Sequence, residues 1–282
     1  MTPADLANLA DLLHRRSGLV VTADKARLIE SKLAPVARRF GFRDCGALFA
    51  ELPYPPEELA RAITEAMTTN ESSFFRDRAP FEYFRDVMVP ALCLARADKR
   101  RLRIWCAAAA CGQEVYSLAM LLDEMELAAQ GWKIDLIATD LSAEAIARAK
   151  EGLYSQYEVQ RGLPVQLLLN HFVQDGTNWR IAERLRRMVS FGTFNLLDHY
   201  GWLGEMDVIF CRNALIYFDA HTKQTVIAKL AETLASDGYL VLGAKESGVD
   251  MSAWTAERAG GIHTRPRGSA SQPARRLSAR RA

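Results

Sequence analysis

The segment that most constrains the fold is RIWCAAAACGQEVYSLAM, residues 103–120, because it predicts a buried strand, a turn and an amphipathic helix in immediate succession. The strand at 102–107 is apolar, and the apolar residues after position 112 recur at helical spacing. The turn at 108–112 contains only alanines, Cys111 and Gly112, so a ligand could approach the backbone and the free N–H groups that begin the helix. Ordinary α/β proteins contain similar connections, and this segment alone therefore leaves the function open.

Further strands extend the same pattern. KIDLIATD, residues 133–140, predicts a second buried strand that ends in Asp140, and Ser142 is suited to cap the helix after it. An acidic residue at this position commonly accepts hydrogen bonds from ribose hydroxyls. We expect more strands near 188–191, 206–211 and 239–243, with a helix before the last of them that ends at Gly238. Alternating strands and helices predict a mostly parallel sheet whose ligand binds at the carboxyl ends of the strands.

The amino-acid composition argues against several classes of protein. The 282 residues are 49% hydrophobic, yet no apolar run approaches the length of a membrane span. The first residues, MTPADLANLADLLHRR, predict an amphipathic helix rather than a signal sequence, so we expect a cytoplasmic protein without membrane insertion. The five cysteines have no CxxC or Cys/His ligand spacing, and we expect no metal site.

Charge is unevenly distributed. The net charge is +2, but residues 263–282 hold six arginines and no acidic residue in a Ser/Pro/Ala-rich stretch, which predicts a disordered basic tail. Such a tail is either simply solvated or contacts an acidic partner. The rest of the chain, with 30 basic and 34 acidic residues, has no wide basic field, so we expect no nucleic-acid partner.

Residues 1–67 predict a separate helical domain, which the Pro-rich ELPYPPEEL interrupts before its last helix. Lys25, Lys32 and Arg39 are seven residues apart and therefore nearly aligned along its second helix. This basic stripe is suited to an acidic helical partner, although an ordinary solvated helix face would have the same pattern.

Several motifs in order along the chain carry a family resemblance. They are TTNESSFFRD (68–77), WCAAAACGQEVYSLA, ATD, EVQRGLP (158–164), NLL, FCRNALIYFD and DGYLVLGAKES. Together, from about residue 10 to 250, they resemble the CheR family of chemotaxis receptor methyltransferases, which methylate glutamate side chains on receptor helices.

The resemblance implies a fold, a cofactor and a site. The fold is α/β, a Rossmann-like class I methyltransferase domain at 91–262, preceded by the helical domain at 1–67 and a linker with a helix at 68–90. A small antiparallel subdomain is expected at about 171–191. The cofactor is S-adenosylmethionine (SAM), with S-adenosylhomocysteine (SAH) as product. The implied cofactor-binding residues are Asn70, Ser72, Arg76, Glu114, Asp140, Asn195, Leu196, Asn213 and Ala214.

The resemblance also places Arg76 and Tyr217 at the transferred methyl, as the catalytic residues. A glutamate with a pKa of about 4.3 is already ionised at pH 7, so the reaction requires no general base. This agrees with the five histidines of the chain, which fall in no constellation. The resemblance also implies that the partner is the cytoplasmic helices of methyl-accepting chemotaxis receptors. We expect the stripe Lys25, Lys32 and Arg39 to bind these helices.

Two departures from the family pattern bear on activity. Ala110 and Cys111 replace hydroxyl residues in the turn, and Val115 replaces a proline; each lost hydrogen bond to the cofactor would cost about 0.5 to 1.5 kcal/mol. The segment FVQDGTNWRI in the small subdomain is short, so we expect a member that does not use a C-terminal pentapeptide tether on its receptor.

Other classes of function fit less well. A nicotinamide oxidoreductase would share the acidic strand end, but the chain has no GxGxxG. A nucleic-acid methyltransferase would have an Asn/Asp-Pro-Pro-aromatic loop where CRNALIYF stands. The altered turn at 110–115 motivates the main alternative, a catalytically weak or inactive module that binds SAM or SAH and acts in regulation.

Overall fold

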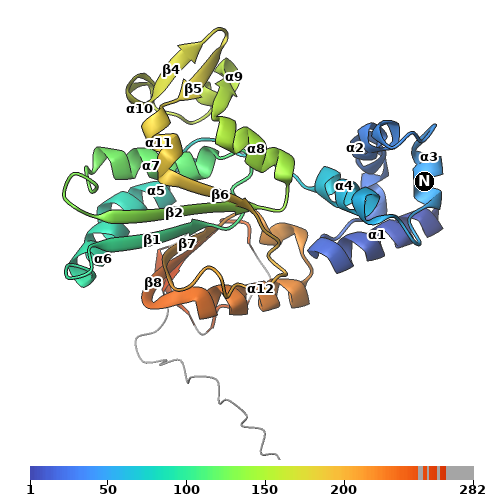
Figure 1. Cartoon of the computed structure of the whole chain (residues 1–282). Coiled ribbons are helices and arrows are strands. Elements are labelled where there is room, and N and C mark those ends of the chain that lie inside the picture. The colour runs from blue at the N-terminus through green and yellow to red at the C-terminus, as the bar shows by residue number, and fades with distance from the viewer. Residues whose placement is uncertain (247–249, 253, 259–260, 265–282) are drawn as a thin grey trace, which may run out of the picture.

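The structure, a computed structural model, describes residues 1–246, 250–252, 254–258 and 261–264. A helical N-terminal domain precedes a domain built on a mostly parallel sheet, from which a small antiparallel sheet projects (Figure 1). The expected fold class is confirmed. The basic tail predicted for 263–282 is not: its first two residues belong to the last strand of the sheet, and 265–282 lie outside the described residues.

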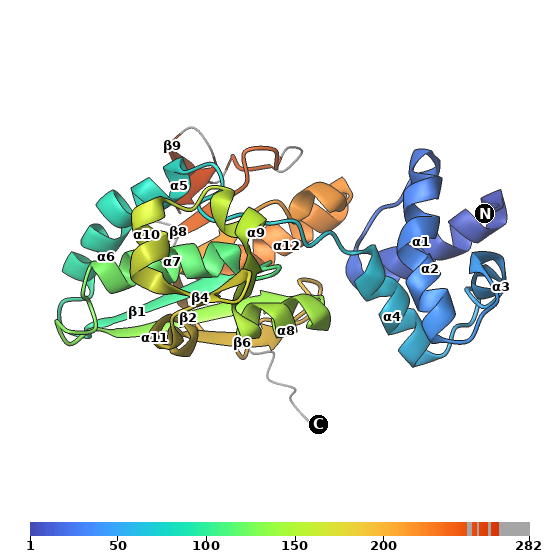
Figure 2. The ribbon, with the colours of Figure 1, turned by 90° about the horizontal axis from the view of Figure 1, so that it is seen from above.

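The N-terminal domain contains α1 (Pro3–Ser17), the 3-10 turn η1 (Ala23–Lys25), α2 (Ala26–Arg39), α3 (Cys45–Ala50) and α4 (Glu57–Met67). In α1, Thr2 and Asp5 form a capping box, in which each side chain accepts a hydrogen bond from the other's backbone N–H. The helix ends at Gly18, whose φ of +73° is the left-handed conformation that favours glycine. The apolar faces of the helices share a core of their own, so this part of the chain packs as a unit (Figure 2).

The linker after α4 is extended at first and then helical. Phe74 and Phe75 are buried against the second domain and anchor the linker there. The chain continues through α5 (Ala79–Tyr83), the π-helical turn η2 (Phe84–Met88) and α6 (Val89–Ala95). This helical run therefore extends past the expected boundary at residue 90.

The main sheet has the strand order β6-β2-β1-β7-β8-β10-β9 in the described residues. Its strands are β1 (Arg101–Cys106), β2 (Lys133–Asp140), β6 (Val189–Thr193), β7 (Met206–Cys211), β8 (Leu234–Leu242), β9 (Thr255–Arg258) and β10 (Ile262–Thr264). The strands from β6 to β8 in this order are parallel, and β10 is antiparallel to both of its neighbours, β8 and β9. The order reverses beside β1, and this is the position at which open parallel sheets bind ligands.

Helices cover both faces of this sheet. They are α7 (Gln113–Glu124), α8 (Ala143–Glu151), α11 (Glu183–Met188) and α12 (Ala220–Thr233). Side chains alternate along β1, so Ile104 packs with α5 and α7 on one face and Trp105 packs with α12 on the other. This two-sided burial explains why the strands are nearly continuous apolar runs in the sequence.

One sequence expectation fails at the end of α12. The helix stops at Thr233 and β8 begins at once, so Gly238 lies inside the strand instead of ending the helix. A Cβ at Gly238 would lie 2.9 Å from the carbonyl oxygen of Asp207. The pairing of β7 with β8 shifts register between Met206 and Val208, and the glycine thus marks an irregularity in the sheet.

The small subdomain begins earlier than expected. It contains β3 (Leu153–Ser155), α9 (Gln156–Gln160), α10 (Val165–His171), β4 (Phe172–Asp175) and β5 (Asn178–Ile181), with the strand order β3-β5-β4. The predicted limits of 171–191 are therefore wrong at both ends, since 183–193 form α11 and β6 of the main domain. With three residues, β3 is too short to show a period of two in the sequence, and only its antiparallel pairing with β5 reveals it.

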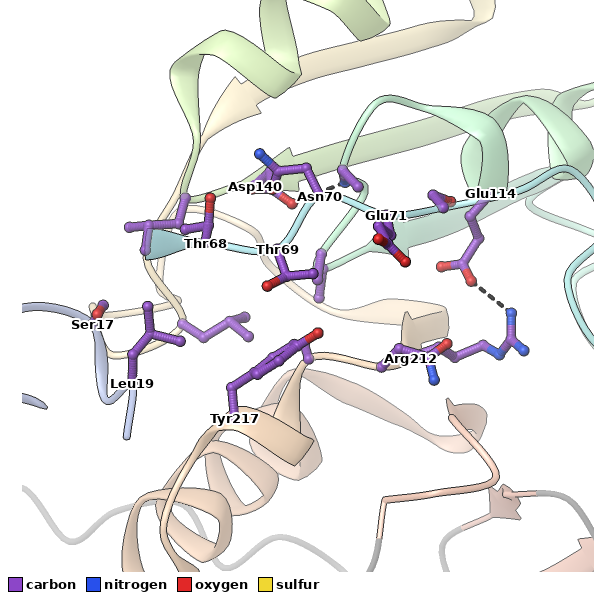
Figure 3. A pocket seen from close by; sticks show the side chains of 18 of the residues that line it. Ser17, Leu19, Thr68, Thr69, Asn70, Glu71, Glu114, Asp140, Arg212 and Tyr217 are labelled. Atoms are coloured by element: carbon purple, nitrogen blue, oxygen red, sulfur yellow. Dashed lines mark hydrogen bonds and ion pairs between the residues drawn. The ribbon is translucent and has the colours of Figure 1, made fainter. Parts of the chain in front are cut away.

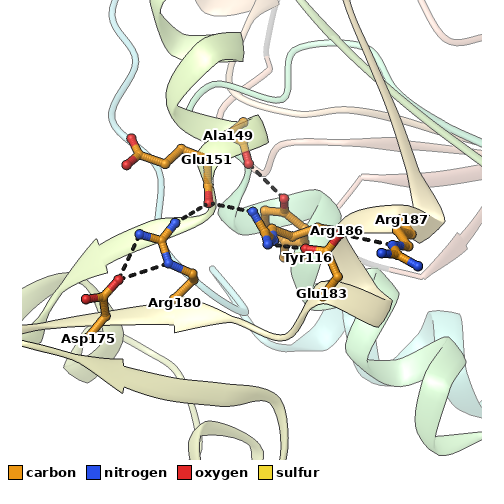
Figure 4. A network of polar contacts seen from close by, with 8 residues as sticks. All are labelled: Tyr116, Ala149, Glu151, Asp175, Arg180, Glu183, Arg186 and Arg187. Carbon is orange, nitrogen blue, oxygen red and sulfur yellow. Dashed lines mark hydrogen bonds and ion pairs between the residues drawn. The ribbon is translucent and has the colours of Figure 1, made fainter.

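Polar contacts join this subdomain to the end of α8 (Figure 4). The carbonyl oxygen of Glu151 accepts hydrogen bonds from Arg180 at 3.3 Å and Arg186 at 3.4 Å, and the carbonyl oxygen of Ala149 accepts one from the Tyr116 hydroxyl at 2.7 Å. Carbonyls at a helix end have no partner within the helix, so these side chains satisfy them. Arg180 belongs to β5, and its bond to Glu151 joins the subdomain to the end of α8. Within the described part of the chain, no helix has both the length and the apolar character needed to cross a membrane.

Candidate active site at the carboxyl ends of the parallel strands

A cleft lies where the loops after β1, β2, β6 and β7 meet the linker. Its empty volume is about 860 Å³, which includes space open to solvent. Every residue that the sequence assigned to the cofactor or to catalysis lines this cleft. Figure 3 shows the Tyr217 hydroxyl and the Glu114 carboxylate pointing into the space between the linker and the strand ends.

The turn after β1 brings backbone to the surface of the cleft. Ala110 has a φ of +47° and Gly112 a φ of +91°, both in the left-handed region. A Cβ at Gly112 would lie 2.9 Å from the Cβ of Ala149 and 3.1 Å from the Tyr154 hydroxyl, so a larger residue would push α8 away. Ala107, Ala108 and Ala110 add only methyl groups to the wall, which leaves room for a ligand near the backbone.

Asp140 fixes the neighbouring loops. One carboxylate oxygen accepts a hydrogen bond from the N–H of Ala110 and the other from the N–H of Ser142, each at 2.9 Å. The residue is only 8% exposed, and burial raises the pKa of this carboxyl, while the backbone N–H donors act in the opposite direction. Each oxygen can accept more than one hydrogen bond, so the carboxylate can still bind hydroxyl groups in the cleft.

Cys111 does not face the cleft. Its sulfur lies 3.6 Å from Nη1 of Arg148, and the side chain is 4% exposed. Burial raises the pKa of its thiol, so the residue behaves as a structural cysteine. Val115 is also fully buried in the core. Of the replaced residues, only Ala110 lines the cleft. A hydroxyl group that could contact a ligand in the cleft is therefore missing at that position alone.

Sequence reasoning missed a buried arginine that organises one end of the cleft. Nη1 of Arg212 donates to Oε2 of Glu114 at 2.8 Å, and Nη2 donates to Oδ2 of Asp77 at 2.7 Å and to the carbonyl oxygen of Arg76 at 3.1 Å. The side chain is 1% exposed. Arg212 precedes Asn213 in the FCRNALIYFD motif, and a charged residue directly after a buried strand was the signal that could have identified it.

Glu114 keeps one carboxylate oxygen free. Oε1 is buried and has no hydrogen-bond partner among the described residues, although Oε2 is paired with Arg212. Burial raises the pKa of this carboxyl and the nearby Arg212 lowers it. An unsatisfied buried carboxylate oxygen is costly, so this atom calls for a positively charged donor in the cleft.

The loop after β7 supplies the opposite wall. Asn213 has a φ of +60°, and the N–H of Ala214 donates to Oε1 of Glu246 at 3.0 Å. A Cβ at Gly243 would lie 2.9 Å from the backbone nitrogen of Asn213, so the residue after β8 must be glycine for this loop to pack. The 3-10 turn η3 (Leu215–Tyr217) comes next and carries Tyr217 into the cleft.

Asn195 and Arg76 have different surroundings. The amide nitrogen of Asn195 donates to the carbonyl oxygen of Arg16 at 2.6 Å, and its oxygen accepts from the N–H of Leu197 at 3.0 Å, so the protein holds this side chain in place. The Arg76 guanidinium, in contrast, has neither an ion pair nor a hydrogen bond to any residue that the structure describes. It is thus the cation that stays available at the cleft.

The basic stripe lies outside the cleft. Its middle member, Lys32, binds another part of the protein and is not left free for a partner. Lys32 donates to the carbonyl oxygens of Met67 and Thr68 at the end of α4, and burial lowers the pKa of its ammonium. Its position on the helix face was predicted correctly, but the unsatisfied carbonyls at the end of α4 bind it. Lys25 and Arg39 are exposed. Lys25 was predicted on the second helix, but it lies in the 3-10 turn η1 directly before α2.

The N-terminal domain also reaches the cleft, which the sequence did not indicate. Ser17 and Leu19 line it at the edge nearest Tyr217 (Figure 3). Sequence reasoning likewise missed several further lining residues: Thr68, Thr69, Glu71, Leu141, Phe194 and Phe218.

Comparison with known proteins agrees with this geometry. A family model described as "CheR methyltransferase, all-alpha domain" matches residues 4–68, and one described as "CheR methyltransferase, SAM binding domain" matches residues 70–259. The chain is 37% identical to Chemotaxis protein methyltransferase 1 of Pseudomonas aeruginosa over 248 residues, which are 86% of this chain and 90% of that protein. It is 35% identical to Chemotaxis protein methyltransferase of Vibrio parahaemolyticus over 239 residues, 83% of this chain and 86% of that protein.

Among solved structures, the plantazolicin methyltransferase BpumL in complex with SAH is 14% identical over 83% of this chain and 67% of that chain, with a TM-score of 0.33. At this sequence identity and TM-score, the similarity supports no conclusion about this chain. The family matches cover both domains, and the all-alpha match ends where the linker begins. The chain therefore belongs to the CheR methyltransferase family and is a SAM-dependent methyltransferase.

Proposed function

We propose that this protein transfers the methyl group of SAM to glutamate side chains of methyl-accepting chemotaxis receptors, which yields glutamate methyl esters and SAH. The observation that carries the proposal is the Arg76 guanidinium, which has no ion pair or hydrogen bond among the described residues and lines a cleft whose other cation, Arg212, is already bound to carboxylates. The relatives from Pseudomonas aeruginosa and Vibrio parahaemolyticus are both named chemotaxis protein methyltransferases. The alternative of an inactive SAM-binding module rested on the altered turn, and Cys111 and Val115 of that turn are buried and do not line the cleft.

The residues of the cleft fit the parts of SAM. Asp140 has free acceptor capacity for the ribose hydroxyls, and the unsatisfied Oε1 of Glu114 is suited to the ammonium group of the methionine part. Leu196 and Asn195 would flank the adenine. We further assign Asn70 and Ser72 of the linker, with Asn213 and Ala214, to the methionine end.

The chemistry needs alignment more than proton transfer. When bound, SAM supplies a sulfonium methyl that a carboxylate oxygen can attack directly. The receptor glutamate is ionised at neutral pH, so neither Arg76 nor Tyr217 has to remove a proton. Arg76 holds the carboxylate by a charge-assisted hydrogen bond, and the Tyr217 hydroxyl donates a second one, which together orient the nucleophile and keep it from being buried unpaired.

Recognition of the receptor is assigned to the N-terminal domain. Because Lys32 is bound to the linker, we assign contact with an acidic receptor helix to Lys25 and Arg39 of the stripe. The absence of a pentapeptide tether stays a prediction, and so do a cytoplasmic location and the absence of a nucleic-acid partner. The turn between β4 and β5 is short, which agrees with the first of these.

The reaction itself is tested with receptor-enriched membranes and SAM labelled in its methyl group. We expect the wild-type protein to transfer label to the receptor, and mild base to release the label as methanol, because carboxyl methyl esters hydrolyse in base. Heat-denatured protein is the control for non-enzymatic labelling. Label that is absent, or that resists base, would contradict glutamate methylation.

The cofactor site is tested with Asp140→Asn. The change removes a charged acceptor and turns an amide donor toward one of the N–H groups, so SAM affinity should fall about 10- to 150-fold, which corresponds to about 1.5 to 3 kcal/mol. Titration calorimetry with SAM and SAH measures this effect. Asp135→Asn is the matched control, since Asp135 lies on the same strand outside the cleft and pairs with Arg101. Equal affinity in both variants would remove Asp140 from the site.

The catalytic cation is tested with Arg76→Ala. Loss of a charge-assisted hydrogen bond to the substrate carboxylate should lower kcat/KM for methyl transfer about 10- to 150-fold and leave the melting temperature within a few degrees. Arg78→Ala, two residues along the same linker and exposed, is the matched control. If Arg76→Ala works at the wild-type rate while folded, another residue holds the glutamate.

The receptor-binding face is tested with the double charge reversal Lys25→Glu and Arg39→Glu. Exposed ion pairs contribute about 0.2 to 1 kcal/mol each, so KM for the receptor should rise about 2- to 30-fold and SAM affinity should not change. The wild-type KM should increase with salt, because such pairs are screened. Lys99→Glu with Lys150→Glu makes the same change of charge on exposed residues of the other domain. A KM unaffected by the first pair would identify the stripe as a solvated face.

A further inference from the structure

The N-terminal domain holds the loop that carries Tyr217. Residues 17–20, which we call the docking segment, are the last residue of α1 and the three that follow it. Within this segment, Leu19 and Val20 run antiparallel to residues 217–218. The N–H of Val20 donates to the carbonyl oxygen of Tyr217 at 2.9 Å, and Leu19 pairs with Phe218 as in a β-ladder. Figure 1 shows the end of α1 meeting the start of α12 at this place.

Contacts on either side of the docking segment tie it to the same wall of the cleft. Nε2 of His14 lies 2.7 Å from Oδ2 of Asp219, the residue that caps α12. The carbonyl oxygen of Arg16 accepts the hydrogen bond from Asn195. Gly18 is packed so closely on α12 that a Cβ there would lie 2.8 Å from the Cγ2 of Thr222. The last turn of α1 thus meets residues 195 and 217–222 at several points.

The same domain fixes the opposite wall. Arg16 forms a two-point ion pair with Glu57 at 2.8 and 2.6 Å, which joins α1 to α4. Lys32 of α2 then holds the carbonyls of Met67 and Thr68, where α4 passes into the linker. Residues 68–72 of that linker line the cleft. The N-terminal domain is therefore connected to both sides of the space in which SAM would bind.

A domain that only recognises a receptor would need no such connections. Three of its partners, Asn195, Tyr217 and Phe218, are themselves lining residues of the cleft, and the domain adds Ser17 and Leu19 to the lining. We propose that the docking segment is a positioning element of the cofactor site, which holds the Asn195 and Tyr217 loops and thereby raises the affinity for SAM before any receptor binds. The proposal rests on the proposed function in one respect, namely that these two loops face the cofactor.

The first test weakens docking from outside the cleft. His14→Glu places a carboxylate against Asp219, and we expect the Kd for SAM, measured without receptor by calorimetry, to rise at least fivefold. Adding Asp219→Asn removes the repulsion and keeps a good helix cap, so it should restore the affinity. Arg15→Glu is the matched control, because Arg15 is on the same turn but pairs with Asp11 of its own helix.

The second test acts on the hydrogen bond to Tyr217. Val20→Pro removes the N–H donor, and Val20→Ala keeps it while shortening the side chain, so the difference between them isolates this bond. We expect a weaker SAM affinity in Val20→Pro alone. Hydrogen exchange of residues 214–219 should be faster in Val20→Pro and in His14→Glu than in their controls, again without receptor.

Two outcomes would overturn the inference: a SAM affinity within twofold of wild type in both folded variants, or a loss in His14→Glu that Asp219→Asn does not restore. Both readouts are independent of methyl transfer. A wild-type protein that binds SAM but does not label receptors would overturn the proposed function and leave this inference standing. Unchanged SAM affinity in variants that still label receptors would overturn this inference and leave the proposed function standing.

Discussion

The site depends on one buried guanidinium, that of Arg212. An isolated charge at 1% exposure would be prohibitively costly, and removing one partner of a buried pair costs about 3 to 5 kcal/mol. Arg212 avoids this cost by binding Glu114, Asp77 and the carbonyl oxygen of Arg76 at once. These partners come from α7 and from the linker, so the arginine joins the end of β7 to both. If the linker moved away from the strand ends, this buried charge would lose two of its three partners and keep only Glu114.

The arrangement explains how a short linker becomes part of an active site. Phe74 and Phe75 bury their rings against the main domain, and Arg212 binds the backbone carbonyl of the next residue, Arg76. Because its backbone is held in place, Arg76 extends its side chain into the cleft from a fixed position. On the other wall, the docking segment performs the same task for Tyr217 through the N–H of Val20. The two side chains that we propose as catalytic are thus constrained at their backbones and extend into the cleft, an arrangement suited to aligning a nucleophile.

Local sequence patterns predicted much of the fold, whereas features that depend on long-range contact were missed. The strand–turn–helix at 102–122 and the strand ending at Asp140 were predictable because apolar period and turn chemistry are local. The subdomain limits were not, since three residues at 153–155 form a strand only by pairing with β5. Lys32 was predicted on the correct helix face, but the carbonyls that bind it lie more than thirty positions away. Family resemblance identified the cleft residues, whereas their partners in the N-terminal domain came only from the structure.

The distribution of charge in the cleft favours different positions for cationic and anionic groups. Asp140, Glu114 and Glu71 give the lining a surplus of carboxylates, and Arg212 is already shared between Glu114 and Asp77. Such a lining favours a cofactor with an ammonium and a sulfonium, and it would repel the carboxylate of a glutamate from most of the cleft. Among the described lining residues, Arg76 is the cation that has no carboxylate partner. Within this lining, Arg76 is therefore the position that favours an anionic group, either the carboxylate of SAM or that of the glutamate which we propose as the nucleophile.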